Sequence, residues 1–170
     1  MTKARDVSTP TALVLLNTTT FSAQSSVSIN NVFTSSYENY QIVYTLTTDY
    51  GANLNLRIRA SGTDYTTATQ CATVIERAST GFTTGASTVD SGAYLGFARQ
   101  SKSAGIINIY SPQLAATETA LTSNTLNFTS GYHSNWLNMC AFNTTSSYDG
   151  FTMFLNIGTM TGTIKIYGYK

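Results

Sequence analysis

Hydrophobic and polar positions alternate most regularly between Asn39 and Gly62, and this stretch predicts two β-strands. One side of the first half carries Tyr40, Ile42, Tyr44 and Leu46, and one side of the second half carries Leu54, Leu56, Ile58 and Ala60. Side chains alternate across a strand, so each half has one apolar and one polar face. Asp49, Tyr50 and Gly51 lie between the halves and supply turn residues, with Gly51 able to take a positive φ. The pattern predicts a β-hairpin that covers a hydrophobic core.

Similar alternation recurs along the rest of the chain and predicts further strands. We expect them over residues 12–16, 18–23, 25–29, 69–76, 94–99, 105–110, 126–129, 136–142, 151–157 and 164–169. The continuous apolar run at 12–16 predicts a strand that is buried on both faces. Gly96 lies inside a strand and predicts a bulge or a close backbone approach. One helical turn is expected over 33–38, loops over 61–68 and 77–86, and a loop with at most a turn of helix over 112–122.

Many short strands without helices between them are typical of an all-β, antiparallel β-sandwich, and a jelly roll is the topology that we favour. The length of 170 residues fits a single domain. We expect a short N-terminal arm over residues 1–10, which Pro10 keeps out of regular structure, and a β-sandwich domain over residues 11–170. The charged residues of the arm, Lys3, Arg5 and Asp6, are candidate assembly contacts with a neighbouring chain.

Charged residues make up only 10% of the chain, and the polar load falls on Thr, Ser and Asn. Ordinary soluble domains contain about 25% charged residues. The net charge of +1 gives no electrostatic footprint for nucleic acid or for an anionic membrane. No apolar run approaches the ~20 residues of a membrane helix, and no cleaved export signal is expected. Such a composition suits a chain whose surface is covered by its own copies or by a larger particle. A weakly charged secreted β protein is the plainer alternative.

The two cysteines, Cys71 and Cys140, fall in separate predicted strands. Two thiols in a chain of this length do not form a disulfide framework, so buried free thiols are the simpler interpretation. A bridge between them requires the two strands to be neighbours.

Catalytic and metal-binding patterns are scarce in the sequence. His133 is the one histidine, and it lies in a predicted polar loop without a nucleophile elbow. No CxxC, HxxH, HExxH or calcium-loop spacing occurs, and the acidic residues stand in isolation. We therefore expect no enzyme activity, no cofactor and no metal site.

Aromatic and basic residues supply the remaining candidate contacts. Candidate ligand- or receptor-facing aromatics beside predicted loops are Tyr65, Tyr132, Trp136 and Tyr148. Flat apolar rings among polar neighbours suit sugars and protein interfaces, although rings that cap the ends of a sandwich are the plainer alternative. On the polar face of the central stretch, Arg57 and Arg59 are further candidate assembly contacts. Replacing both with Thr is expected to weaken assembly more than folding.

Three parts of the chain carry a resemblance to a known group of proteins. TKARD at 2–6, SINNVFTSSYENYQIVY at 28–44 with LNLRIRASGTDYTT at 54–67, and DGFTMF at 149–154 with MTGTIKIYGYK at 160–170 resemble small virion proteins and tail-fibre-like domains of marine podovirus-like bacteriophages. The resemblance implies a trimeric or otherwise homo-oligomeric β-sandwich module on the virion surface, assembled in the host cytoplasm. It implies no catalytic residues.

The expected function is that of a virion structural protein, either a capsid decoration or knob protein or a tail-fibre subunit. Its expected partners are other virion proteins of the capsid or tail. The chain departs from a complete tail fibre because it has no heptad shaft and no repeats. The alternative is a receptor- or carbohydrate-binding fibre tip that contacts a host surface glycan.

Overall fold

The computed structural model describes residues 12–66, 69–77, 81–89, 92–129 and 132–170. Among these residues the regular elements are all strands. In chain order they are β1 Val14–Gln24, β2 Ser26–Ile29, β3 Asn39–Thr48, β4 Ala52–Ala60, β5 Thr63–Asp64, β6 Thr69–Arg77, β7 Gly81–Val89, β8 Ala93–Ala98, β9 Lys102–Tyr110, β10 Thr119–Thr129, β11 Tyr132–Phe142, β12 Gly150–Leu155 and β13 Met160–Tyr169. The prediction of an all-β fold is confirmed.

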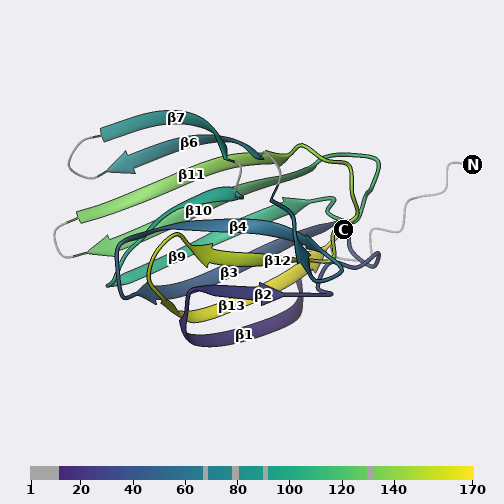
Figure 1. Ribbon diagram of the computed structural model, residues 1–170, viewed down its shortest axis with the longest axis horizontal. Coiled ribbons are helices and arrows are strands. Elements are labelled where there is room, and N and C mark those ends of the chain that lie inside the picture. The colour runs from purple at the N-terminus through teal and green to yellow at the C-terminus, as the bar shows by residue number, and fades with distance from the viewer. Residues whose placement is uncertain (1–11, 67–68, 78–80, 90–91, 130–131) are drawn as a thin grey trace, which may run out of the picture.

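The strands form two antiparallel sheets that pack as a sandwich (Figure 1). The larger sheet has eight strands in the order β1-β13-β3-β9-β10-β11-β6-β7. The smaller sheet has five strands, in the order β2-β12-β4-β5, and β8 pairs with the first part of β4 on the same side as β5. In Figure 1, β2, β12 and β4 lie over the β13, β3 and β9 region, whereas β6 and β7 extend beyond them. The sandwich is confirmed, but this strand order does not confirm a jelly roll.

The predicted hairpin over Asn39–Gly62 is wrong, because its two strands belong to different sheets. β3 pairs with β13 and β9, whereas β4 pairs with β12, β5 and β8. The connection at residues 49–51 therefore crosses the sandwich. The Asp49 carboxylate anchors it, accepting hydrogen bonds from the Thr159 backbone N–H at 2.6 Å and the Thr159 hydroxyl at 3.0 Å. The backbone hydrogen bond from Thr159 holds the pKa of Asp49 below its usual range.

The core lies between the sheets and consists of the apolar positions that the alternation identified. β3 contributes Tyr40, Ile42, Tyr44 and Leu46, β4 contributes Leu54, Leu56 and Ile58, and β12 and β13 add Phe151, Met153, Ile164 and Ile166. All of these side chains are at most 1% exposed. In these four strands alternation thus specified which face is buried, although it did not specify which strand is the neighbour of each.

Several local predictions differ from the structure. The strands expected at 12–16 and 18–23 form the single strand β1, the loop expected over 61–68 contains β5, and the loop expected over 112–122 contains the start of β10. The apolar run at 12–16 is not buried on both faces, because β1 is an edge strand on which Val14 and Leu15 are 42% and 53% exposed, and Leu13 just before it is 49% exposed. The predicted loop at 77–86 contains the start of β7. The expected helical turn at 33–38 is a tight turn, closed by a hydrogen bond from Tyr37 N–H to the Thr34 carbonyl at 3.3 Å.

Cys71 and Cys140 are joined by a disulfide, so the interpretation as free thiols is wrong. β6 and β11 are neighbours, and their register places the two cysteines directly opposite each other with a Cα–Cα distance of 4.2 Å. Both residues are buried, at 5% and 4% exposure. The bridge ties together two strands near the β7 edge of the eight-stranded sheet.

The structure confirms the prediction for Gly96, which lies at a β-bulge and at a close approach between the β8 backbone and β11. Across from β4, Leu54 pairs with Gly96 and Asn55 pairs with Tyr94, so Leu95 is the extra residue of a bulge. The φ of Gly96 is 134°, and a Cβ built there would lie 3.0 Å from the Cβ of Trp136. Without a side chain, β8 can approach β11 of the opposite sheet closely.

Candidate interaction surfaces

Strands β10 and β11 place polar side chains on the inner face of the eight-stranded sheet. The buried polar residues of these two strands are Thr119, Ser123, Thr125, Asn127, Ser134 and Asn138. Hydrogen bonds to β8 satisfy part of this set, because the carbonyl of Leu95 accepts from Thr125 Oγ1 at 2.6 Å and from Asn138 Nδ2 at 3.0 Å. The hydroxyl of Tyr44 also lies 2.6 Å from Thr125 Oγ1. Polar groups that are hydrogen-bonded in this way are tolerated inside a fold.

The apolar side chains of the same strands consequently point away from the core. On the far side of the sheet, Leu126 and Phe128 of β10 and Leu137 and Met139 of β11 are 40–64% exposed. Neighbouring strands extend the apolar area with Val74 of β6 and with Ile106 and Tyr110 of β9, which are 37–43% exposed. A hollow of about 420 Å³ lies beside Val74, Leu137 and Met139 and reaches β7.

The register of β3, β9, β10, β11 and β6 arranges twenty outward positions in four rows, which we call the outer face. The rows are Val43-Ile106-Asn124-Leu137-Val74, Gln41-Asn108-Thr122-Met139-Ala72, Thr45-Ala104-Leu126-Asn135-Glu76 and Asn39-Tyr110-Ala120-Ala141-Gln70. Glu76 is the only one of these positions with a formal charge, and it stands at the β6 end of its row. The outer face is therefore broad, nearly neutral and partly apolar.

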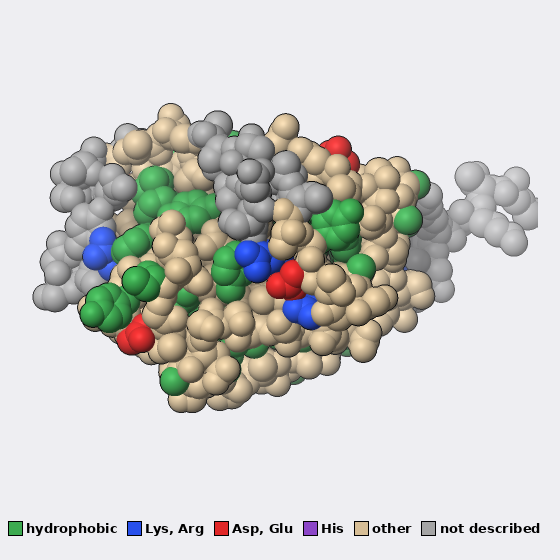
Figure 2. Space-filling model, viewed as in Figure 1, with side chains coloured by type: hydrophobic (Ala, Val, Ile, Leu, Met, Phe, Trp, Pro, Cys, Tyr) green, Lys and Arg blue, Asp and Glu red, His purple; other side chains and the backbone are tan. Residues whose placement is uncertain are grey.

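The two predicted assembly arginines lie on the opposite side of the sandwich, over the five-stranded sheet. In Figure 2 a red side chain lies between blue ones on this face, in otherwise uncharged surroundings. The carboxylate of Asp64 is 2.5 Å from Arg59 Nη1 and 3.7 Å from Arg57 Nη1. Arg57 also stacks over the Phe154 ring, 4.1 Å from its centroid.

Arg59 is held by neighbours from three other parts of the chain. It donates hydrogen bonds to Asn30 Oδ1 at 2.9 Å, Ser28 Oγ at 2.8 Å and Thr152 Oγ1 at 2.6 Å, and it also contacts the Gly62 carbonyl. Thr152 in turn donates to Asp64 Oδ1 at 2.6 Å. The Arg59 side chain is 12% exposed. Both arginines thus have partners within the chain, and their role as assembly contacts stays a prediction.

Replacing Arg59 with Thr is expected to lower the free energy of unfolding by about 2 kcal/mol, because Asp64 would lose its closest cationic partner in a half-buried setting. Urea unfolding followed by tryptophan fluorescence or circular dichroism measures the change. Lys102→Thr is the matched control, since Lys102 is exposed, and it should change stability by less than about 0.5 kcal/mol. An unchanged midpoint in Arg59→Thr would show that the cluster adds nothing to folding.

The predicted receptor-facing aromatics do not gather on one surface. Tyr148 is fully buried, so it does not face outward as the sequence suggested, and its ring packs edge-on against Tyr65 at 5.5 Å. Trp136 packs edge-on against Tyr94 at 5.6 Å on the inner side of β11. Both rings therefore pack within the sandwich, which agrees with the plainer alternative that these aromatic side chains close the fold. Tyr132 starts β11, and its side chain is outside the described residues.

The arm over residues 1–10 is also outside the described part of the chain, including Lys3, Arg5 and Asp6. Their role as assembly contacts is therefore still a prediction.

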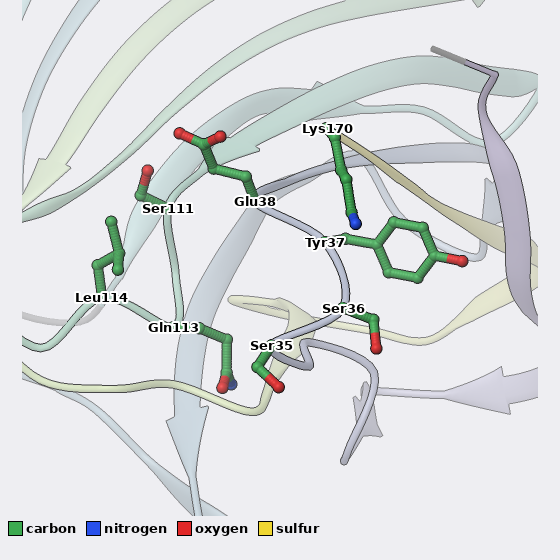
Figure 3. A pocket seen from close by; sticks show the side chains of 8 residues that line it. All are labelled: Ser35, Ser36, Tyr37, Glu38, Ser111, Gln113, Leu114 and Lys170. Atoms are coloured by element: carbon green, nitrogen blue, oxygen red, sulfur yellow. The ribbon is translucent and has the colours of Figure 1, made fainter. Parts of the chain in front are cut away.

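A pocket of about 380 Å³ opens beside the turn before β3 (Figure 3). Its lining combines the Tyr37 ring with Ser35, Ser36, Glu38, Ser111, Gln113, Leu114 and Lys170. Figure 3 shows the Lys170 amine directed toward Tyr37, with Glu38 turned toward the Ser111 side. Gln113 is engaged in the fold, because its side-chain amide donates to the carbonyls of Phe33, at 2.8 Å, and Tyr148. The pocket offers hydrogen-bonding groups beside one aromatic ring.

The single histidine and the possible metal ligands were the remaining candidates for site chemistry. His133 lies in β11 rather than in a loop, where its ring meets Phe128 at 5.8 Å. Within the described residues, no group of three or more His, Cys, Asp or Glu side chains is arranged to hold a metal ion. Those same residues include no helix that is long and apolar enough to cross a membrane.

Comparisons with known proteins provide no family for this chain. No protein-family model matches it, and no curated protein matches it. Among solved structures, a sucrose-6-phosphate hydrolase from Lactobacillus gasseri is similar at a TM-score of 0.38 and 16% identity. The match covers 87% of this chain and 28% of the hydrolase, so the chain spans just over a quarter of that protein's length. A likeness this distant carries no functional inference.

The outer face was missed in the sequence, although a signal for it is present. Residues 124–128 and 136–140 alternate, but Leu126, Phe128, Leu137 and Met139 are out of phase with the buried Cys140 and Thr125. Assigning the apolar positions of each strand to the core hides this inversion. It becomes visible when the register relative to β6 and β9 is known.

Proposed function

We propose that this chain is a structural subunit of a bacteriophage virion, displayed on the particle surface as a capsid decoration protein or as a tail-fibre subunit. It acts by multimeric assembly and surface presentation, and it has no enzymatic role. The outer face is the observation that supports this function. Exposed apolar side chains on a nearly uncharged sheet are typical of surfaces that contact protein. The virion setting rests on the sequence resemblance.

Immunogold electron microscopy tests this proposal directly. Antibodies raised against the recombinant chain are applied to purified phage particles from a culture that carries the gene. Gold on the capsid or on the tail is the expected result and distinguishes decoration from a fibre. Particles that carry no label while the protein accumulates in infected cells would overturn the proposal.

A receptor- or carbohydrate-binding fibre tip is the second candidate function. The pocket beside Tyr37 favours it, because an aromatic ring with hydroxyl and charged neighbours is the kind of lining that holds a sugar. Binding to a glycan array, lost in Tyr37→Ala and kept in Tyr50→Ala, would support it. Tyr50 is a suitable control because it is 64% exposed and is not part of this pocket. The fibre-tip function would be excluded if the array shows no bound glycan and if deletion of the gene leaves adsorption of the phage unchanged.

A further inference from the structure

We propose that the outer face of the eight-stranded sheet is a self-association surface, on which a second copy of this chain packs sheet against sheet. This inference rests on the proposed function, since it names the surface through which the subunit assembles. It places assembly on the opposite side of the sandwich from Arg57 and Arg59.

The distribution of apolar side chains singles out this face. Met139 is 64% exposed, Leu137 44% and Ile106 43%, and they come from two neighbouring rows of the register, Ile106 from β9 and the other two from β11. With Val74 and Leu126, which are 37% and 41% exposed, they form the apolar part of the outer face, and the largest apolar patch of a monomer is often a functional contact surface. Strands β10 and β11 carry Ser, Thr and Asn on the inner side instead. The apolar side chains of the outer face can therefore be buried only by a second molecule.

The size of the outer face matches that of a specific interface. Twenty side chains on five strands form it, and a stable interface of standard size takes roughly 20–30 residues from each partner. Two sheet faces stack about 10 Å apart, with side chains from both interdigitating. The hollow of about 420 Å³ beside Leu137 and Met139 provides room for protruding side chains of the second copy.

The low charge of the outer face favours a second copy of the chain as the partner that binds there. A nucleic acid or an anionic membrane requires a basic surface, whereas Glu76 is the only formal charge among these twenty positions, and Lys102 and Lys165 stand singly at their border. In a two-fold dimer the same patch meets itself, so a nearly neutral face brings no like charges together. The Asn, Gln and Thr side chains of the rows can hydrogen-bond across such an interface. The outer side of the five-stranded sheet differs, because its charged groups already satisfy one another.

Sedimentation velocity over a thousandfold range of protein concentration tests this inference, using the full chain. Leu137→Lys and Met139→Thr are compared with the wild type. We expect wild-type self-association to weaken at least 100-fold in Leu137→Lys, because two buried lysines would face each other across the two-fold axis. Met139→Thr keeps strand propensity and should weaken association about 10-fold.

Ile157→Lys is the matched control, because Ile157 is 57% exposed and lies in the connection between β12 and β13, away from the outer face. It should associate like the wild type. Circular dichroism establishes that each variant is folded. If Leu137→Lys unfolds, Met139→Thr decides the outcome.

A wild type that stays monomeric throughout would overturn the inference. Association that persists in both outer-face variants would also overturn it, while leaving the virion role intact. Conversely, particles without immunogold label would remove the virion role, whatever the chain does in the centrifuge.

Discussion

Reduction of the Cys71–Cys140 disulfide is expected to lower the free energy of unfolding by about 4 kcal/mol. The two residues are 69 positions apart, and a cross-link of that span removes much of the freedom of the unfolded chain. Both cysteines are buried, so little of the loss is recovered by hydration of the thiols. Urea unfolding with and without a phosphine reductant measures the effect, and thiol titration reports the extent of reduction.

The Cys71→Ser/Cys140→Ser double variant provides the control, because the reductant should not shift its unfolding curve. Coincident wild-type curves, with two thiols titrated only in the reduced sample, would contradict the expectation. A protein made in a reducing cytoplasm is expected to fold with two thiols and to gain the bridge after release from the cell. Thiol titration of freshly lysed and of extracellular material would detect that difference.

The second large effect is expected at Gly96. Gly96→Ala should cost about 3 kcal/mol of stability, because a φ of 134° is unfavourable for a side chain and because the new Cβ would press on Trp136 at 3.0 Å. The bulge would have to rearrange. The hydrogen bonds from Thr125 and Asn138 to the Leu95 carbonyl depend on that bulge. Thermal unfolding followed by tryptophan fluorescence measures the loss.

Substitutions at two other glycines distinguish the cost of the positive φ from the cost of the steric contact with Trp136. Gly62 has a φ of 79° but open space around its Cβ position, so Gly62→Ala reports backbone strain alone and should cost about 1 kcal/mol. Gly85 in β7 has neither a positive φ nor a neighbour within 4 Å, and Gly85→Ala should change stability by less than about 0.5 kcal/mol. Equal melting temperatures for all three variants would show that β8 does not need the bulge.

In β3 and β4, period-two alternation was sufficient to predict the buried residues but not the partners of each strand. Tyr44 and Leu56 are both fully buried, as the pattern predicted, yet their strands lie in different sheets. Alternation indicates which face of a strand is apolar. The neighbour of that strand depends on contacts between residues that are distant in the sequence. The disulfide was unpredictable for the same reason. Cys71 and Cys140 both occupy inward positions, but only the β6–β11 register places them opposite each other.

The edge strand and the outer face show a second limit of the pattern. An apolar run such as that around Leu15 reads as a core strand, although β1 borders the sheet and exposes it. Similarly, a rule that assigns the apolar positions of a strand to the core would turn those of β10 and β11 inward. Buried Asn138 and exposed Met139 reverse that expectation, because β8 supplies the hydrogen bonds that make a polar interior possible. Such a reversal depends on a strand from the other sheet.

Hydroxyl-radical footprinting of Met139 tests the self-association surface most directly. Met139 is 64% exposed in the single chain, and Tyr50 is equally exposed at 64% but lies outside the outer face. In the assembled protein, we expect Met139 to be labelled several-fold more slowly than in dilute solution, with Tyr50 labelled at the same rate in both. Labelling of Met139 that is rapid and independent of concentration would contradict assembly through the outer face.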